Sequence, residues 1–174
     1  IDTIKSTLSS IGTAAFRNNK ALTELKLPAS LRTVGNSAFE GCVKMRSVTF
    51  NGYNLIKDEE TGAERYEPDP SVKSKLELIG SSAFSKCEAL TSVSIPDGVT
   101  EIKDSAFNSC KSLVTVEFGD NSVLKVIGAQ AFANCVKLGS NLGNLVENRI
   151  SLTTVDLPNS LITVGKEAFK GCEG

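Results

Sequence analysis

Cysteine is the residue type in this chain with the most chemical potential, because a thiolate can act as a nucleophile, a metal ligand or a redox partner. The five cysteines are Cys42, Cys87, Cys110, Cys135 and Cys172. Zinc sites draw two or more thiolates from close spacings such as Cys-x-x-Cys. Here the two closest cysteines, Cys87 and Cys110, are 23 residues apart. The spacing therefore favours no metal site, and we expect no cofactor.

Other catalytic groups are missing from the sequence. The chain has no histidine, the usual general base near neutral pH and a common zinc ligand. No phosphate-binding loop and no paired catalytic carboxylates stand out, so we predict a protein that is not an enzyme and has no catalytic residues. A formal net charge of -1 gives no reason to expect nucleic acid. The absence of an apolar run of about 18 residues argues against direct membrane insertion.

A repeat explains the spacing of the cysteines. The dipeptide Ala-Phe recurs six times, ending at Phe16, Phe39, Phe84, Phe107, Phe132 and Phe169. The intervals are 23, 45, 23, 25 and 37 residues, so the longer ones read as a repeat of about 23 residues that carries an insertion. A cysteine follows each Phe by three residues, except that Asn19 takes this place in the first repeat.

Each repeat also contains two apolar pairs. The first has the period of two that a strand with one buried face requires: Leu25/Leu27, Val48/Phe50, Val93/Ile95, Val116/Phe118 and Val155/Leu157. Proline ends this strand at Pro28, Pro96 and Pro158, because it lacks a backbone donor. The second pair is spaced by three: Leu8/Ile11, Leu31/Val34, Leu76/Ile79, Val99/Ile102, Leu124/Ile127 and Leu161/Val164. A glycine usually follows and suits a sharp corner.

A unit of 23 residues cannot bury its strand face and its Phe alone, so the units must stack. We predict one domain over residues 1–174, a right-handed α/β solenoid of about six repeats. Its strands form one parallel sheet, and a helical or 3-10 turn carries each Ala-Phe-x-x-Cys. The Phe, Leu and Cys positions then form internal columns.

The pattern L-x-x-V-x-I-P-x-x-V-x-x-I-x-x-x-A-F-x-x-C resembles the BspA-like leucine-rich repeat. The resemblance implies a curved leucine-rich repeat coil with the parallel sheet on its concave side and short helical turns on its convex side. It also implies surface display or secretion, adhesion or host-protein binding, and neither an enzyme nor a cofactor. Departures from the pattern are local: Asn19 for Cys, Lys103 for glycine, and Asn51 and Gly119 for proline.

Two insertions interrupt the array. Residues 51–75 follow the strand that ends at Phe50 and predict a projecting β-hairpin. Residues 139–151 precede the strand expected from Thr153, and their leucines at helical spacing predict a short amphipathic helix. The last unit ends after Cys172 and does not reach its next apolar position. We therefore expect a segment of a longer array.

The hairpin insertion holds one group of candidate binding residues, Tyr53, Arg65 and Tyr66. Tyrosine and arginine are enriched in binding hot spots. The alternative is a solvated decoration whose tyrosines lie against the flank of the solenoid.

Outward positions of the predicted strands form the second candidate surface. They are Glu24, Lys26, Ser47, Thr49, Ser92, Ser94, Thr115, Glu117, Thr154 and Asp156. The alternative is that Ser and Thr are simply good solvated strand residues. The column of cysteines reads as small buried hydrophobes, because parallel Cβ vectors keep neighbouring sulfurs from the disulfide torsion.

These features predict a non-enzymatic module of a cell-surface or secreted protein that binds a host or matrix macromolecule, protein or glycan. Binding would use the concave sheet or the 51–75 hairpin. The alternative is a structural spacer with no ligand of its own. We expect an extracellular or surface location and a monomer.

Overall fold

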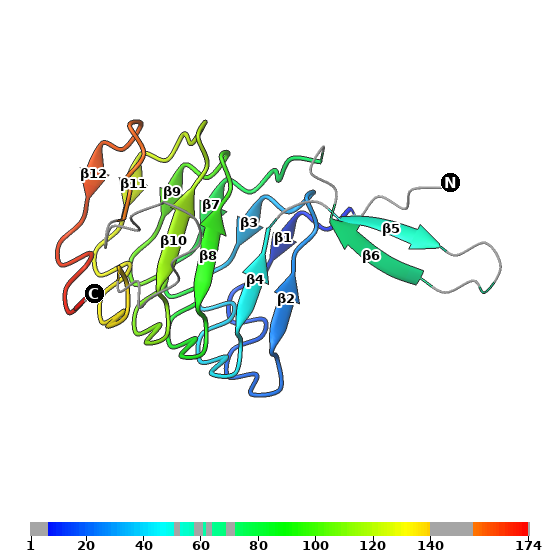
Figure 1. The fold of residues 1–174 in the computed structure, drawn as a ribbon, viewed down its shortest axis with the longest axis horizontal. Helices are drawn as coiled ribbons and strands as arrows, with labels where there is room; N and C mark the ends of the chain where they lie inside the picture. Colours follow the sequence, from blue (N-terminus) through cyan, green and yellow to red (C-terminus); the bar gives the residue numbers. More distant parts are fainter. Residues whose placement is uncertain are drawn as a thin grey trace, which may run out of the picture.

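The computed structural model describes residues 7–50, 53–57, 61, 64–68, 72–139 and 155–173, with the strands at 53–57 and 64–68 described by their backbone. The chain winds as a solenoid whose successive turns lie side by side (Figure 1). Two parallel sheets run along it, and an antiparallel pair of strands forms a third sheet. No helix is present among the described residues.

The long-strand sheet forms at the first apolar pair of four repeats. Its strands are β2 (Glu24–Lys26), β4 (Ser47–Thr49), β8 (Ser92–Ile95) and β10 (Thr115–Phe118), in the order β10-β8-β4-β2. All neighbours are parallel. The inward members Val48, Val93 and Val116 are at most 7% exposed. The alternation with a period of two therefore predicted correctly which side chains of these strands are buried.

The second apolar pair forms a short-strand sheet of its own, where the sequence predicted a single sheet. Its strands are β1 (Ser10–Ile11), β3 (Thr33–Val34), β7 (Leu78–Ile79), β9 (Glu101–Ile102), β11 (Val126–Ile127) and β12 (Thr163–Val164), paired in that order. The prediction of one sheet is wrong because the chain stays extended after the corner and its backbone groups again face the next repeat, which gives them parallel partners.

One predicted strand has no counterpart in the long-strand sheet. Residues Val155–Leu157 lie in the described chain but form no strand, and the Leu157 side chain is 43% exposed. The helix expected at 139–151, apart from Gly139, falls outside the described residues.

The phenylalanines form the predicted internal column. Neighbouring rings lie 5.2–5.3 Å apart between centroids with interplanar angles of 2–10°, from Phe16 through to Phe169. The four central rings have no exposed surface, whereas Phe16 at one end is 44% exposed. Offset stacking of this kind adds to the free energy gained by burial.

The turns that carry Ala-Phe-x-x-Cys are not helical, contrary to the prediction. Left-handed backbone occurs at two positions in every repeat. Two residues before Phe it is adopted by Ala14, Ser37, Ser82, Ser105, Gln130 and Glu167, and two residues after Phe by Asn18, Gly41, Lys86, Ser109, Asn134 and Gly171.

Stacking explains this strained backbone. Phe16 N donates to Ala38 O of the next repeat at 2.7 Å, and the residues two before and two after Phe16 donate to that repeat in the same way. The N–H groups between them close tight turns within the repeat, as Arg17 N does to Ala14 O at 3.1 Å. A helix would direct all of these N–H groups along its own axis. Alternating backbone handedness instead directs every second one at the neighbouring repeat.

The left-handed positions predict opposite effects for two substitutions. Lys86→Gly should stabilise the fold by about 0.5–1 kcal/mol. A left-handed residue with a Cβ costs about 1–2 kcal/mol, and the greater entropy of glycine in the unfolded chain offsets part of the relief. Gly41→Ala should destabilise it by about 1–2 kcal/mol, because Gly41 has left-handed backbone with φ 73°; the Asn18 side chain would also have to move away from the new Cβ. Urea melts of both variants test this, and equal signs would contradict the turn geometry.

The insertion at 51–75 contains the antiparallel pair β5 (Tyr53–Lys57) and β6 (Glu64–Pro68). Its register runs from Tyr53 opposite Pro68 to Lys57 opposite Glu64. The pair extends away from the two parallel sheets (Figure 1). The described part of the predicted insertion thus contains an antiparallel pair of strands.

Candidate functional site

The long-strand sheet presents its alternate side chains outward. Of the eight candidate residues on strands β2, β4, β8 and β10, seven are exposed and Thr49 is half-buried. Parallel register aligns Glu24, Ser47, Ser92 and Thr115 in one row across all four strands. Lys26 lies opposite Thr49, and Ser94 opposite Glu117. The sheet therefore gathers these eight residues on one polar surface.

The remaining candidates do not join this surface. Asp156 is exposed but lies outside any strand, and Thr154 falls outside the described residues. In the antiparallel pair, Tyr66 lies opposite Leu55 and Arg65 opposite Ile56 along the backbone. The side chains of Tyr53, Arg65 and Tyr66 are also outside the described part of the chain.

The cysteines form a column, as predicted, and each is a free thiol. They also make a contact that the sequence analysis missed. Each thiol donates to the carbonyl oxygen of the Phe in the preceding repeat, at 3.2–3.3 Å; Cys87 Sγ to Phe39 O is one example. The same Phe39 carbonyl accepts the N–H of Cys42 in its own repeat, at 3.2 Å. The thiols thus link neighbouring repeats.

Burial favours the protonated form of four of these thiols. It raises the pKa of Cys87 to about 12, with a smaller upward effect from the neighbouring Cys42. It raises the pKa of Cys172 to about 11, that of Cys110 well above its ordinary value, and that of Cys42 as well. The side-chain hydrogen bond with Cys110 instead lowers the pKa of Cys135, against the effect of burial. Since the thiolate is the reactive form, the four thiols with raised pKa are suited to packing more than to nucleophilic chemistry.

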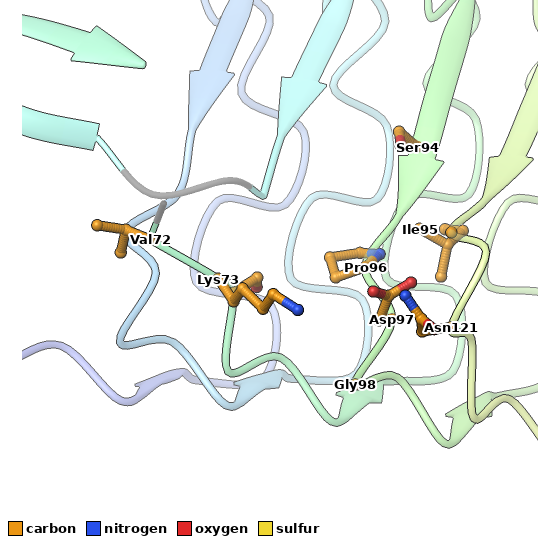
Figure 2. A pocket seen from close by; sticks show the side chains of 10 residues that line it. Val72, Lys73, Ser94, Ile95, Pro96, Asp97, Gly98 and Asn121 are labelled. Carbon is orange, nitrogen blue, oxygen red and sulfur yellow. The ribbon is translucent and has the colours of Figure 1, made fainter. Parts of the chain in front are cut away.

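A cleft of about 570 Å³ lies where the 51–75 insertion rejoins the solenoid. One side is the returning segment with Val72 and Lys73, and the other is formed beyond the ends of β8 and β10 by Pro96, Asp97 and Asn121 (Figure 2). Among the candidates whose side chains the structure describes, Ser94 alone lines it. It is the feature that the sequence analysis missed.

Two glycines help to open this cleft. Gly98 occupies the corner position that Ser30 and Ser160 hold in other repeats, and Gly119 takes the place of the corner proline. A Cβ at Gly119 would run into Asp97 Oδ1, so the carboxylate packs directly against the glycine backbone. The signal in the sequence was the departure at Gly119, which directly follows β10, three residues before Ser122.

Neither metal binding nor membrane crossing has support in the described residues. They contain no group of three or more Cys, Asp or Glu side chains placed to hold a metal ion. They also contain no helix long and apolar enough to cross a membrane.

The repeat pattern, its six-fold recurrence and the stacked columns can now be compared with known proteins. A family model described as a BspA type leucine rich repeat region matches residues 2–61 and 69–172, in six copies. This chain belongs to the BspA-type leucine-rich repeat family. The Phe column, the thiol ladder and the left-handed turns are therefore the form that this repeat takes here.

Two solved bacterial structures share the fold. A leucine-rich repeat protein from Eubacterium ventriosum is 21% identical, with a TM-score of 0.67 over 93% of this chain and 34% of its own. The pneumococcal vaccine antigen PcpA is 22% identical, with a TM-score of 0.63 over 94% of this chain and 34% of its own. This chain thus spans about a third of each relative. Comparison with curated proteins finds no match.

Proposed function

We propose that this BspA-type repeat segment is a non-enzymatic binding module of a cell-surface or secreted protein. Its partner is a protein or glycan of a host or matrix, and it binds through the outward face of the long-strand sheet or through the 51–75 insertion. Membership of the family supports the proposal, and so does the similarity to a protein named as a vaccine antigen.

The aligned polar face carries this proposal. Four parallel strands place Glu24, Ser47, Ser92 and Thr115 in one row, and all four side chains are exposed. A rigid stack fixes the spacing of these groups, so a partner that matches the row loses little conformational freedom from the protein side on binding.

The proposal is tested by capturing host matrix proteins and glycans on the immobilised chain. The double variant Lys26→Ala/Glu117→Ala probes the sheet, and Tyr53→Ala/Tyr66→Ala probes the insertion. We expect one of the two double variants to lose capture, and Lys125→Ala, an exposed residue outside both surfaces, to keep it. Unchanged capture in both would remove these sites.

A structural spacer gives a different result. It would capture no partner, and charge reversal at Glu24 and Glu117 would leave every readout unchanged. Either outcome would overturn the binding proposal in favour of the spacer.

A further inference from the structure

A corner hydroxyl that can join neighbouring repeats is missing at the cleft. At two corners of the solenoid a serine makes this bond: Ser30 Oγ donates to Leu8 O at 2.7 Å, and Ser160 Oγ to Leu124 O at 2.9 Å. Gly98 stands at this corner position in the fourth repeat and has no hydroxyl, and Lys75 and Val123 hold the position in the repeats on either side. A Cβ built at Gly98 would lie 3.1 Å from Leu76 O. Within the described chain, Leu76 O therefore lacks the serine donor that Leu8 O and Leu124 O have.

The backbone N–H of Gly98 also lacks a partner. In the repeats on either side, Lys75 N donates to Ala29 O at 2.8 Å and Val123 N to Asp97 O at 3.0 Å. The equivalent N–H of Gly98 makes no such bond to another described residue, and neither does that of Ser160. Since Gly98 lines the cleft, its N–H is a backbone donor at the cleft wall that the described chain leaves unpaired.

Three polar side chains of the cleft also lack a partner for at least one group within the described chain, whereas Ser74 Oγ accepts the N–H of Leu76 at 3.2 Å. Asp97 Oδ1 is buried and has no hydrogen-bond partner among the described residues. Such an unpaired buried acceptor is costly, by about 1–3 kcal/mol. Lys73 and Asn121 line the same cleft, and neither side chain forms an ion pair or hydrogen bond within the described chain. A small rotation of the Asp97 carboxylate about χ2 would turn either oxygen toward the cleft.

We propose that this cleft binds a saccharide unit. Hydroxyl groups both donate and accept, and so match a lining that offers Asp97 as acceptor and Lys73 and the Gly98 N–H as donors. Val72 and Pro96 add an apolar surface for the C–H face of a sugar ring. The volume of about 570 Å³ lies in the range of small-molecule sites.

Other ligand classes fit the cleft less well. A divalent cation prefers several oxygen ligands with more than one carboxylate, and Asp97 is the only carboxylate among the described residues of the lining. An extended peptide binds most readily by adding to a free strand edge. Here β8 pairs with β10 along its whole length and with β4 at Ser47–Ser92 alone, so the edge left open toward β4 is three residues long. That edge is short, and the charged side chains of the lining, Lys73 and Asp97, lie outside it.

The test is a ¹H–¹⁵N NMR titration of the chain with three probes: cellobiose, diacetylchitobiose and a uronic-acid disaccharide. At millimolar concentrations at least one of them should shift the amide signals of Ser94, Gly98 and Gly119. Asp97→Ala should weaken binding about tenfold or more, because hydrogen bonds to charged groups are the strong ones. Lys73→Ala should weaken it about fivefold and leave the buried corner intact.

Matched controls keep the charge changes comparable. Asp120→Ala removes an exposed carboxylate from the adjacent corner, and Lys75→Ala removes an exposed lysine from the returning segment. Neither residue lines the cleft, so both variants should bind as the parent does. Folding of each variant is checked in the same spectra.

The proposal is overturned if none of the three disaccharides shifts these signals, or if Asp97→Ala and Lys73→Ala both bind as the parent does. An acetylated dipeptide amide that shifts them when the sugars do not would also overturn it. Amide shifts confined to Glu24 and Ser47 would overturn saccharide binding at the cleft and would favour binding at the sheet. The two sites are therefore tested independently.

Discussion

Phe107→Ala is expected to destabilise the protein by about 3–5 kcal/mol, through lost burial and the cavity that remains. The Phe107 ring has no exposed surface. It stacks on Phe84 at 5.2 Å and on Phe132 at 5.2 Å, with interplanar angles of 7° and 2°. Removing it therefore interrupts the column at its centre. Urea and thermal melts followed by circular dichroism measure the loss.

Phe16→Ala is the matched control at the end of the column. Its ring is 44% exposed and stacks on Phe39 at 5.2 Å. We expect it to lose less than half as much stability, since less surface leaves water on folding. A loss below about 1 kcal/mol for Phe107→Ala, or equal losses for both variants, would contradict the column.

High pH is expected to destabilise the protein through its buried thiols. Below the unfolded pKa of about 8.5 both states hold the thiol proton, so these groups cause no pH dependence. Above it the unfolded chain releases protons that the native state keeps, because burial raises the pKa of Cys87 to about 12. Stability then falls as pH rises, by at most about 1.4 kcal/mol per pH unit for each such thiol.

Cys87→Ser separates this effect from the titration of tyrosine and lysine. The serine hydroxyl can still donate to Phe39 O, but it does not titrate in this range. The stability difference between parent and variant should therefore shrink as pH rises from about 8 to about 11. Parallel pH profiles would show that Cys87 does not stay protonated in the native state.

The columns could be predicted from the sequence because stacked repeats place an apolar residue that recurs at a fixed offset directly beside its counterpart in the next repeat. Phe84, Cys87 and Val93 recur at fixed offsets, and each is at most 2% exposed in the structure. The outward residues of the long-strand sheet follow from the same period of two. The spacing of residue types in the sequence is therefore sufficient to predict these parts of the fold and of the candidate surface.

The turns could not be predicted by the same reasoning. Ala-Phe-x-x-Cys has apolar residues three apart, which is also the spacing of one helical turn. Hydrogen bonds to the next repeat determine the backbone conformation of the turn. The spacing of residues within one repeat carries no information about those bonds. Gly41 and Gly171 with Asn18 and Asn134, all two residues after a Phe, were the available sign of left-handed backbone.

The cleft was missed for a related reason. It arises where three local departures meet: the 51–75 insertion, Gly98 and Gly119. Gly98 and Gly119 are 21 residues apart in sequence, but the stack brings their corners together around Asp97. A repeat pattern states what each unit shares, so sites made by differences between units emerge only once the units are placed.

The central claim, that the residues common to the repeats serve the stacked core, is tested most directly by counting alkylated cysteines with mass spectrometry. In denaturant without reductant we predict five labelled thiols, and in the native protein Cys172 should react first while Cys87 and Cys110 stay protected. Fewer than five labels without reductant, or central thiols that react as fast as Cys172 in the native state, would contradict the account.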